Sequence, residues 1–232
     1  MKVLAGWYWK KIGMPPEITE QELCVKVQKL DLISSTDVDM SKLVVNPTVF
    51  ITGDAACLSA DCTDFESWNI PHYLYACNRS LIFHKRQVDH WCSLDVEESI
   101  WFTGYLNSNI ENKKRIIRHT IGEGSLAYDM YWQASKEFES KWQKMVFIAN
   151  SGFFGVLTAL QMGYQKIILG GMPLDNTPHY YDPPDAPGPE WLGTTYQNWM
   201  DFKIEHPQAD CVRSMGGYSA LILGTATKEW AR

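Results

Sequence analysis

The sequence lacks the residue patterns of zinc proteins, membrane proteins and secreted proteins. It holds six cysteines, but none forms a Cys-x-x-Cys pair, and no Cys and His residues stand at zinc-site spacing. No apolar run approaches the roughly 18 residues of a membrane span. The apolar stretch within residues 1–11 is too short for a signal peptide. We therefore expect a soluble, cytoplasmic protein that has free thiols and no membrane span.

The chain also lacks an excess of positive charge. It has 21 Lys and Arg against 27 Asp and Glu, which gives a net charge of −6. Nucleic-acid-binding surfaces carry a basic stripe. The nearest approach to one is the short run at residues 111–119, and such runs are usually solvated faces. The charge balance argues against a nucleic-acid partner.

Complete phosphate-binding and metal-binding motifs are missing as well. The single Gly53 falls short of a full glycine fingerprint, and no Gly-Lys-Ser/Thr follows the glycines at 152 and 155. No Asp-x-Asp follows a strand, because the "DVD" at residues 37–39 lies in an irregular segment. We predict no metal site and no cofactor.

What is present is the composition of a globular domain. The chain has 232 residues, of which 45% are hydrophobic, and this suits one α/β domain over residues 1–232. Residues 14–47 are polar and irregular, so the core is expected from about residue 48. An amphipathic stretch predicts a helix over 125–144. Apolar runs typical of buried parallel strands predict strands at 48–53, 72–78, 88–95 and 115–120.

The clearest pattern is a strand–helix–strand unit over residues 144–175. A tight turn, Asn150-Ser151-Gly152, opens an apolar helix that ends at Gly163, and the strand "KIILGG" follows. Strands alternating with helices predict a Rossmann-like, doubly wound and mostly parallel sheet. In such folds, ligands bind beyond the carboxyl ends of the strands.

Four predicted strand ends carry small or polar residues. Gly53, Asp54 and Ala55 form the first, and Asn78 with Arg79 the second. Asn150, Ser151 and Gly152 form the third, where free helix N–H groups favour an anion. Each of these three ends also has a structural explanation, which is an ordinary turn for the first, a helix cap for the second and close helix–strand packing for the third. The fourth end combines Asp175 with His179, Tyr180, Tyr181 and Asp182; a loop histidine suits acid–base catalysis but is more often a surface residue.

The order and spacing of these segments resemble those of a known enzyme family. The segments are "VFITGDAACLS", "YACNRS", "NSGFFGVLTALQMGYQKIILGGMPLD" and "HYYD". They are similar to those of the bacterial sialyltransferases of glycosyltransferase family 42 and of the related motility-accessory-factor glycosyltransferases. The resemblance covers roughly residues 48–182. It implies the sialyltransferases' variant of the GT-A-like fold and activity without a metal, and relatives of this kind are bacterial or phage-encoded.

The resemblance also implies roles for individual residues. Gly53, Asp54 and Leu58 match the turn that holds the donor nucleotide, and Asn78 matches an Asn that contacts the nucleotide or phosphate. The turn at 150–152 matches the one beside the cytidine. Asp175 matches the Asp that ends a family strand. His179 is the candidate for the catalytic histidine, although the family histidine lies further beyond that strand; His206 is a poorer candidate.

Asp54 departs from the family, which has an asparagine there. A carboxylate beside an anionic donor is unfavourable unless it pairs with a ribose hydroxyl or a base. The donor could therefore differ from a sialic-acid nucleotide, or catalysis could be lost.

The predicted function is transfer of a sugar from a nucleotide donor, with a CMP-sugar favoured, to an unknown acceptor hydroxyl. His179 would act as the base, and Tyr180 or Tyr181 would stabilise the departing phosphate. The nucleotide would be held by residues Gly53, Asp54, Ala55, Asn78, Arg79, Asn150, Ser151, Gly152 and Asp175. Two alternatives stay open, a non-catalytic nucleotide-binding protein and a nucleic-acid-modifying transferase. Self-association into a homo-oligomer is also open.

Overall fold

The protein was analysed as a computed structural model. It describes residues 47–94, 116–120, 130–131, 150–183, 185–186 and 192–232. The irregular segment 14–47, apart from residue 47, and the predicted first strand of the 144–175 unit lie outside the described residues.

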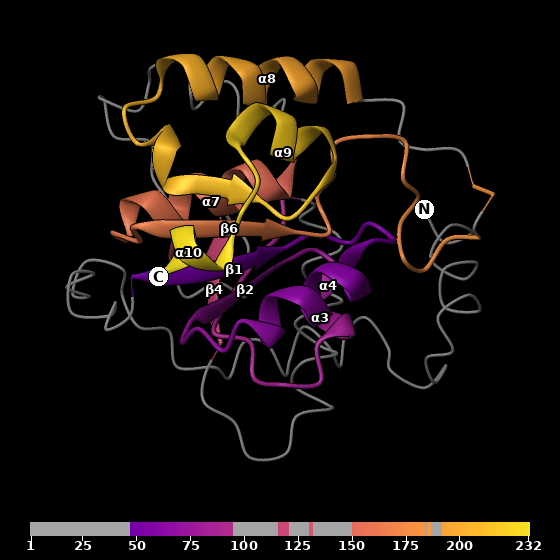
Figure 1. The fold of residues 1–232 in the computed structure, drawn as a ribbon. Coiled ribbons are helices and arrows are strands. Elements are labelled where there is room, and N and C mark those ends of the chain that lie inside the picture. The colour runs from indigo at the N-terminus through magenta and orange to yellow at the C-terminus, as the bar shows by residue number, and fades with distance from the viewer. Residues whose placement is uncertain (1–46, 95–115, 121–129, 132–149, 184, 187–191) are drawn as a thin grey trace.

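A seven-stranded sheet forms the centre of the structure (Figure 1). All of its strand pairings are parallel. The order is β5-β4-β3-β2-β1-β6-β7. The strands are β1 (Thr48–Thr52), β2 (Tyr73–Cys77), β3 (His90–Cys92), β4 (Ile117–Thr120), β5 (Met130–Tyr131), β6 (Lys166–Gly170) and β7 (Val212–Ser214). The predicted α/β class with a parallel sheet is confirmed.

Helices cover both faces of the sheet (Figure 1). On one face lie α7 (Ser151–Gln161), α8 (Leu192–Glu205) and α9 (Gly217–Leu223). On the other lie α3 (Leu58–Ser67) and the short α4 (Ser80–Phe83). A short 3-10 turn, η2 (Ala209–Cys211), precedes β7, and α10 (Lys228–Ala231) ends the chain. Coverage of both faces explains why the strands read as continuous apolar runs.

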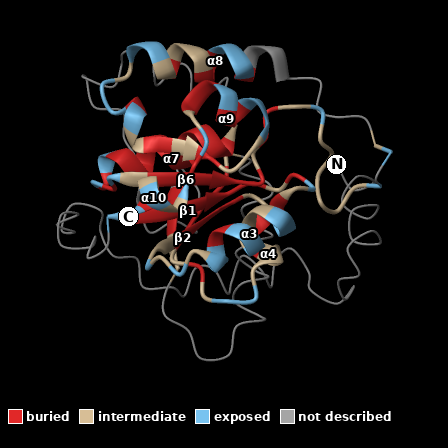
Figure 2. Ribbon diagram, viewed as in Figure 1, coloured by how far each residue is buried: buried red, intermediate tan, exposed pale blue. Residues whose placement is uncertain are grey.

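Alternate residues of strands β1, β2, β3 and β6 enter two separate hydrophobic clusters. In β1, Val49 and Ile51 pack under α7, whereas Phe50 packs on the α3 side. Helix α7 is buried from Ser151 to Leu160, since α8 packs over it. Figure 2 shows this buried centre, with exposed positions on the outer helices. The apolar α7 sequence is thus a central layer of the fold and not a surface helix.

The predicted helix over residues 125–144 is wrong at residues 130–131. These residues form β5, which pairs with His119 and Thr120 of β4. Pairing at the sheet edge overrides the local amphipathic pattern, because a two-residue strand leaves almost no periodicity to detect. The other predicted strands that fall within the described residues are present.

Strand β1 is the topological switch point of the sheet. The chain runs from β1 outward to β5 and then returns to place β6 on the other side of β1. Loops after adjacent strands diverge at such a point, which makes it the usual place for a ligand in a doubly wound sheet. The loops that follow β1 and β6 therefore define where a site is expected.

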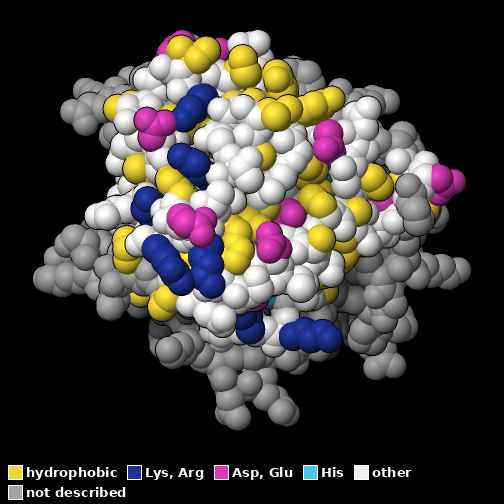
Figure 3. Space-filling model, in the orientation of Figure 1, with side chains coloured by type: hydrophobic (Ala, Val, Ile, Leu, Met, Phe, Trp, Pro, Cys, Tyr) yellow, Lys and Arg dark blue, Asp and Glu magenta, His cyan; other side chains and the backbone are white. Residues whose placement is uncertain are grey.

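On the face shown in Figure 3, hydrophobic side chains gather over α8 and α9, while charges of both signs are interspersed elsewhere. Among the described residues, the large exposed apolar side chains are those of Tyr196, Ile204, Tyr218 and Leu221. None of the described helices has the length and apolar character that a membrane crossing requires.

Two buried histidines lie on the α7 side of β3 and β4. His90 Nε2 is 2.8 Å from the Tyr164 hydroxyl, and His90 Nδ1 is 3.1 Å from His119 Nε2. Burial lowers the pKa of His90 to about 4. Burial, and then the neighbouring His90, hold the pKa of His119 well below its usual value. Both rings are therefore neutral in the folded protein near neutral pH.

These pKa values predict that the free energy of unfolding falls as the pH is lowered from about 6.5 toward 4, because the unfolded chain binds protons that the folded chain excludes. Above pH 6.5 this contribution is complete. Urea unfolding between pH 7 and 5 measures it, in a range where most carboxylates stay ionised. Each histidine adds at most about 1.4 kcal/mol per pH unit. His90→Gln should give a shallower slope, and equal slopes for variant and wild type would contradict the account.

Candidate functional site

The loop after β6 pairs with the turn after β1. Ala55 and His179 form an antiparallel bridge. Ala55 N donates to Gly171 O at 3.1 Å, and Ala56 N donates to Pro178 O at 2.8 Å. Tyr180 N donates to Asp54 O at 2.8 Å. Two segments more than a hundred positions apart in sequence are thus held together at the switch point.

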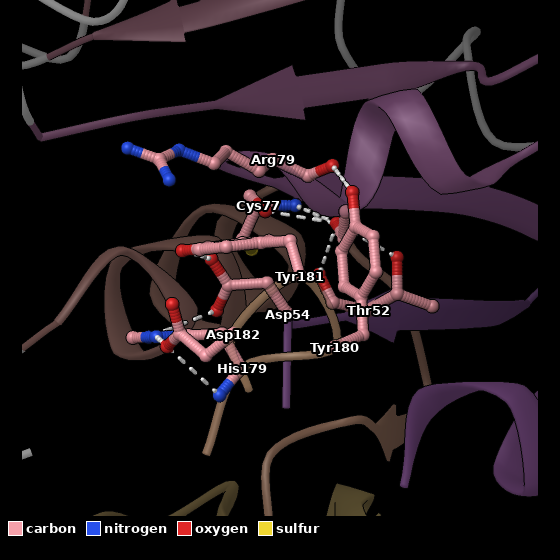
Figure 4. A network of polar contacts seen from close by, with 9 residues as sticks. Thr52, Asp54, Cys77, Arg79, His179, Tyr180, Tyr181 and Asp182 are labelled. Carbon is pink, nitrogen blue, oxygen red and sulfur yellow. Dashed lines mark hydrogen bonds and ion pairs between the residues drawn. The ribbon is translucent and has the colours of Figure 1, made fainter. Parts of the chain in front are cut away.

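This pairing brings His179 beside two carboxylates (Figure 4). His179 Nδ1 lies 2.7 Å from Asp182 Oδ2, and Asp182 N donates to His179 O within the same turn. A carboxylate only accepts, so Nδ1 carries the proton. His179 Nε2 points to the side of Asp54, whose Oδ1 is 3.8 Å away. The side chain of His179 is 33% exposed, so a substrate can reach it.

Tyr181 and Tyr180 connect this histidine to the exit of β2. The ring of Tyr181 stacks on that of His179, and its hydroxyl donates to Asp54 Oδ2 at 3.2 Å. The Tyr180 hydroxyl donates to Arg79 O at 2.9 Å. The Arg79 guanidinium lies 4.5 Å from the centre of the Tyr181 ring. The cluster therefore unites Asp54, Arg79 and His179, which the sequence predicted as site residues.

A buried network fixes the ends of β1 and β2 beneath this cluster. The Ser80 hydroxyl donates to Thr52 O at 2.7 Å and accepts from Cys77 N at 3.0 Å. Thr52 Oγ1 lies 2.9 Å from His84 Nε2. Burial, followed by the charge of Arg86, lowers the pKa of His84 to about 4. These groups are structural, since Ser80 is fully buried and its lone pairs and proton are engaged.

The third predicted strand end lies at the start of α7. Asn150 caps this helix, because its Oδ1 accepts from Phe153 N at 3.0 Å. The Ser151 hydroxyl accepts from Leu94 N at 3.0 Å, and Ser151 O accepts from the Cys92 thiol. The first N–H groups of a helix have no partner within it, so they can receive an anion.

Asn78 lies next to this helix start and has an unpaired group. Its backbone N donates to Cys92 O at 2.9 Å, so Cys92 connects it to Ser151. Asn78 adopts the left-handed conformation, with φ of 49°, which Asn tolerates better than most residues. Its Oδ1 is buried without a hydrogen-bond partner. An unpaired buried acceptor costs about 1–3 kcal/mol, so the burial of Asn78 Oδ1 is not compensated by a hydrogen bond within the described residues.

The space in front of two predicted site glycines is filled by protein. A Cβ on Gly53 would lie 2.5 Å from Met172 Cγ and 2.6 Å from Gly171 O. A Cβ on Gly152 would lie 2.6 Å from Met172 Sδ. In this structure, both glycines are needed to make room for the Met172 side chain.

The remaining predicted residue, Asp175, shapes the loop. Its Oδ1 accepts from Thr177 N at 2.9 Å, which closes a turn before His179. Asp61, on α3, accepts from Gly171 N at 2.7 Å and so anchors the other end of the loop. Burial, with the nearby charges of Asp61 and Asp175, raises the pKa of Cys57 to about 12. Cys57 is therefore a thiol and not a nucleophile near neutral pH.

Sequence reasoning missed the roles of three residues. Asp182 was noticed at the strand exit but was not recognised as the partner of His179, although a three-residue spacing permits it. Asp61 and Met172 act across the fold, and no sequence signal marks such contacts.

No protein-family model, curated protein or solved structure matches the chain. Within the described ranges, no group of three or more His, Cys, Asp or Glu side chains could hold a metal ion. The site is thus defined by its own geometry: a histidine–carboxylate pair, an arginine and a helix start at the switch point of a parallel α/β sheet.

The capping bond at α7 gives a prediction about stability. Asn150→Ala should lower the free energy of unfolding by about 1 kcal/mol, because Phe153 N loses its side-chain acceptor. Asn150→Asp is the matched control, since aspartate caps equally well. Urea unfolding of the three proteins measures the difference. An Ala variant as stable as the wild type would show that the cap does not hold the helix start.

Proposed function

We propose that the protein is a glycosyltransferase that uses a nucleotide-sugar donor, with a CMP-sugar favoured, and that His179 is its general base. The observation that carries the proposal is the 2.7 Å contact between His179 Nδ1 and Asp182 at the switch point. Asp182 fixes the ring so that Nε2, the atom available to accept a proton, is turned away from it. This is the geometry that a general base needs.

The proposed reaction is a direct displacement. His179 Nε2 takes the proton of the acceptor hydroxyl while the acceptor oxygen attacks the anomeric carbon. The bond from that carbon to the donor phosphate breaks, and the nucleotide leaves with the electron pair. Charge therefore develops on the phosphate, and pre-oriented N–H groups and cations stabilise it.

Two features support a cytidine nucleotide near Asn78 and the start of α7. The N–H groups of the first turn of α7 and the positive end of its dipole suit the phosphate. The unpaired Asn78 Oδ1 suits a donor such as the exocyclic amine of cytosine. Arg79 adds positive charge at the exit of β2, which offsets Asp54. Asp54 would then accept from a ribose or sugar hydroxyl instead of facing the phosphate.

The two tyrosine hydroxyls have partners other than the departing phosphate that the sequence predicted. In this structure, the Tyr180 hydroxyl donates to Arg79 O and the Tyr181 hydroxyl donates to Asp54. Stabilising a phosphate would require these bonds to break. We assign both tyrosines to positioning: Tyr181 stacks on the His179 ring, and Tyr180 joins the loop after β6 to the exit of β2.

A non-catalytic nucleotide-binding protein is the second candidate, and one observation favours it. The Met172 side chain fills the space before Gly53 and Gly152, so in this structure a nucleotide cannot lie against either glycine. A nucleic-acid-modifying transferase receives less support, because acidic side chains are scattered over the face in Figure 3, beside the Lys and Arg residues, and the net charge is −6.

Donor cleavage tests the proposal without knowledge of the acceptor. Release of the nucleotide from CMP-sialic acid, UDP-sugars and GDP-sugars would be measured with water or simple glycosides as acceptors. His179→Gln should lower turnover by about 10²–10⁴-fold, because the base is lost. Asp182→Asn should also lower turnover. Both variants should bind the nucleotide as the wild type does, since neither residue is assigned to it.

His206→Gln is the matched control, because His206 stacks on Phe202 of α8, away from the pairing of the two loops. It should keep full turnover. Nucleotide binding without cleavage of any donor in wild type and variants would favour the non-catalytic protein. Undiminished turnover in His179→Gln would exclude His179 as the base.

A further inference from the structure

Met172 lies between the two halves of the candidate site. Its Cγ is 2.5 Å from the Cβ position of Gly53, next to the Asp54–His179 cluster. Its Sδ and Cε are 2.6 Å and 3.1 Å from the Cβ position of Gly152, in the first turn of α7. The thioether therefore spans from the turn after β1 to the helix start.

The space that Met172 fills lies between two parts of the proposed site. The Cβ position of Gly152 is also 3.2 Å from Asn150 Oδ1, so the side chain lies against the capped end of α7. A phosphate at that helix start and a sugar near His179 would have to be joined across this same space. The proposed donor and the Met172 side chain cannot occupy it together.

The backbone that carries Met172 is fixed, whereas its side chain can move. Gly171 N donates to Asp61 at 2.7 Å, and Gly171 O accepts from Ala55 N. Leu174 and the neighbouring Pro173 are buried. Met172 itself is partly exposed, and an unbranched thioether adopts new rotamers at low cost. Movement at this position is therefore movement of the side chain alone.

We propose that the Met172 side chain controls the access of the nucleotide to the site. Its side chain lies across the position of the proposed donor, and it rotates away when the nucleotide binds. This inference rests on the proposed function, because it assumes a nucleotide at this edge of the sheet. The inference adds that the affinity for the nucleotide is limited by the fraction of protein molecules in which the Met172 side chain has moved away.

Isothermal titration with CMP tests the inference in three proteins. Met172→Ala should bind CMP about tenfold more tightly than the wild type, because the site is open in every molecule. Met172→Ile should bind about tenfold more weakly, because a β-branched side chain cannot rotate away as freely.

A second measurement follows the side chain directly. In protein labelled with ¹³C at the methionine methyls, CMP should shift the NMR signal of Met172, which is assigned by its loss in Met172→Ala.

A second pair of variants tests the packing: Gly152→Ala should destabilise the wild type but be tolerated in Met172→Ala. Gly53→Ala should stay destabilising in both backgrounds, because its Cβ also meets the Gly171 backbone oxygen.

The outcomes separate this inference from the proposed function. If the wild type binds CMP but all three affinities agree within about twofold and the Met172 methyl does not shift, the inference is wrong and the proposed function stands. If Met172→Ala is less stable than the wild type but binds CMP with the same affinity, the inference is also wrong, since Met172 would then be a packing residue. If none of the proteins binds CMP, the CMP-donor proposal fails and the inference fails with it.

Discussion

The site depends on one piece of backbone pairing. The segment 178–180, after β6, hydrogen-bonds to the turn 54–56, after β1, and Ala55 and His179 form its bridge. Without this pairing, His179 would lie on an isolated loop. With it, the histidine, Asp182 and Asp54 meet at the switch point of the parallel sheet, and Tyr180 extends the contact to the exit of β2. Two anchors, Asp61 on Gly171 and the turn at Asp175, hold the loop in that place.

The central strands and α7 could be predicted because their patterns are long and apolar. β1, β2 and β6 are buried on both faces, which produces uninterrupted apolar runs, and the turn at Asn150 marks the start of α7. The sheet edge could not be predicted in the same way. β5 has two residues and exists because β4 offers it a partner, so its identity as a strand is a property of the fold and not of its own sequence.

The residue types of the site could be predicted from the sequence, but their arrangement could be predicted only in part. The strand ends at Asp54, Arg79 and His179 converge because carboxyl ends of parallel strands share one edge. The roles of the glycines could not be predicted from the sequence, because a glycine that makes room for a ligand cannot be told from one that makes room for a methionine side chain. Nor could the role of Tyr181 be predicted, because its hydroxyl donates to Asp54 Oδ2. Contacts between side chains far apart in sequence decide these roles, and they decide which polar groups, such as Asn78 Oδ1, are buried without a partner.

The central claim is that the exits of β1 and β2 and the start of α7 form one nucleotide site served by His179. A crystal structure of the protein with CMP tests this most directly. The account predicts the phosphate at the first turn of α7, the base amine within hydrogen-bond distance of Asn78 Oδ1, and His179 Nε2 facing the place where the anomeric carbon of a donor would attach. A nucleotide bound elsewhere, with Asn78 Oδ1 still unpaired and Met172 still lying across Gly53 and Gly152, would contradict it.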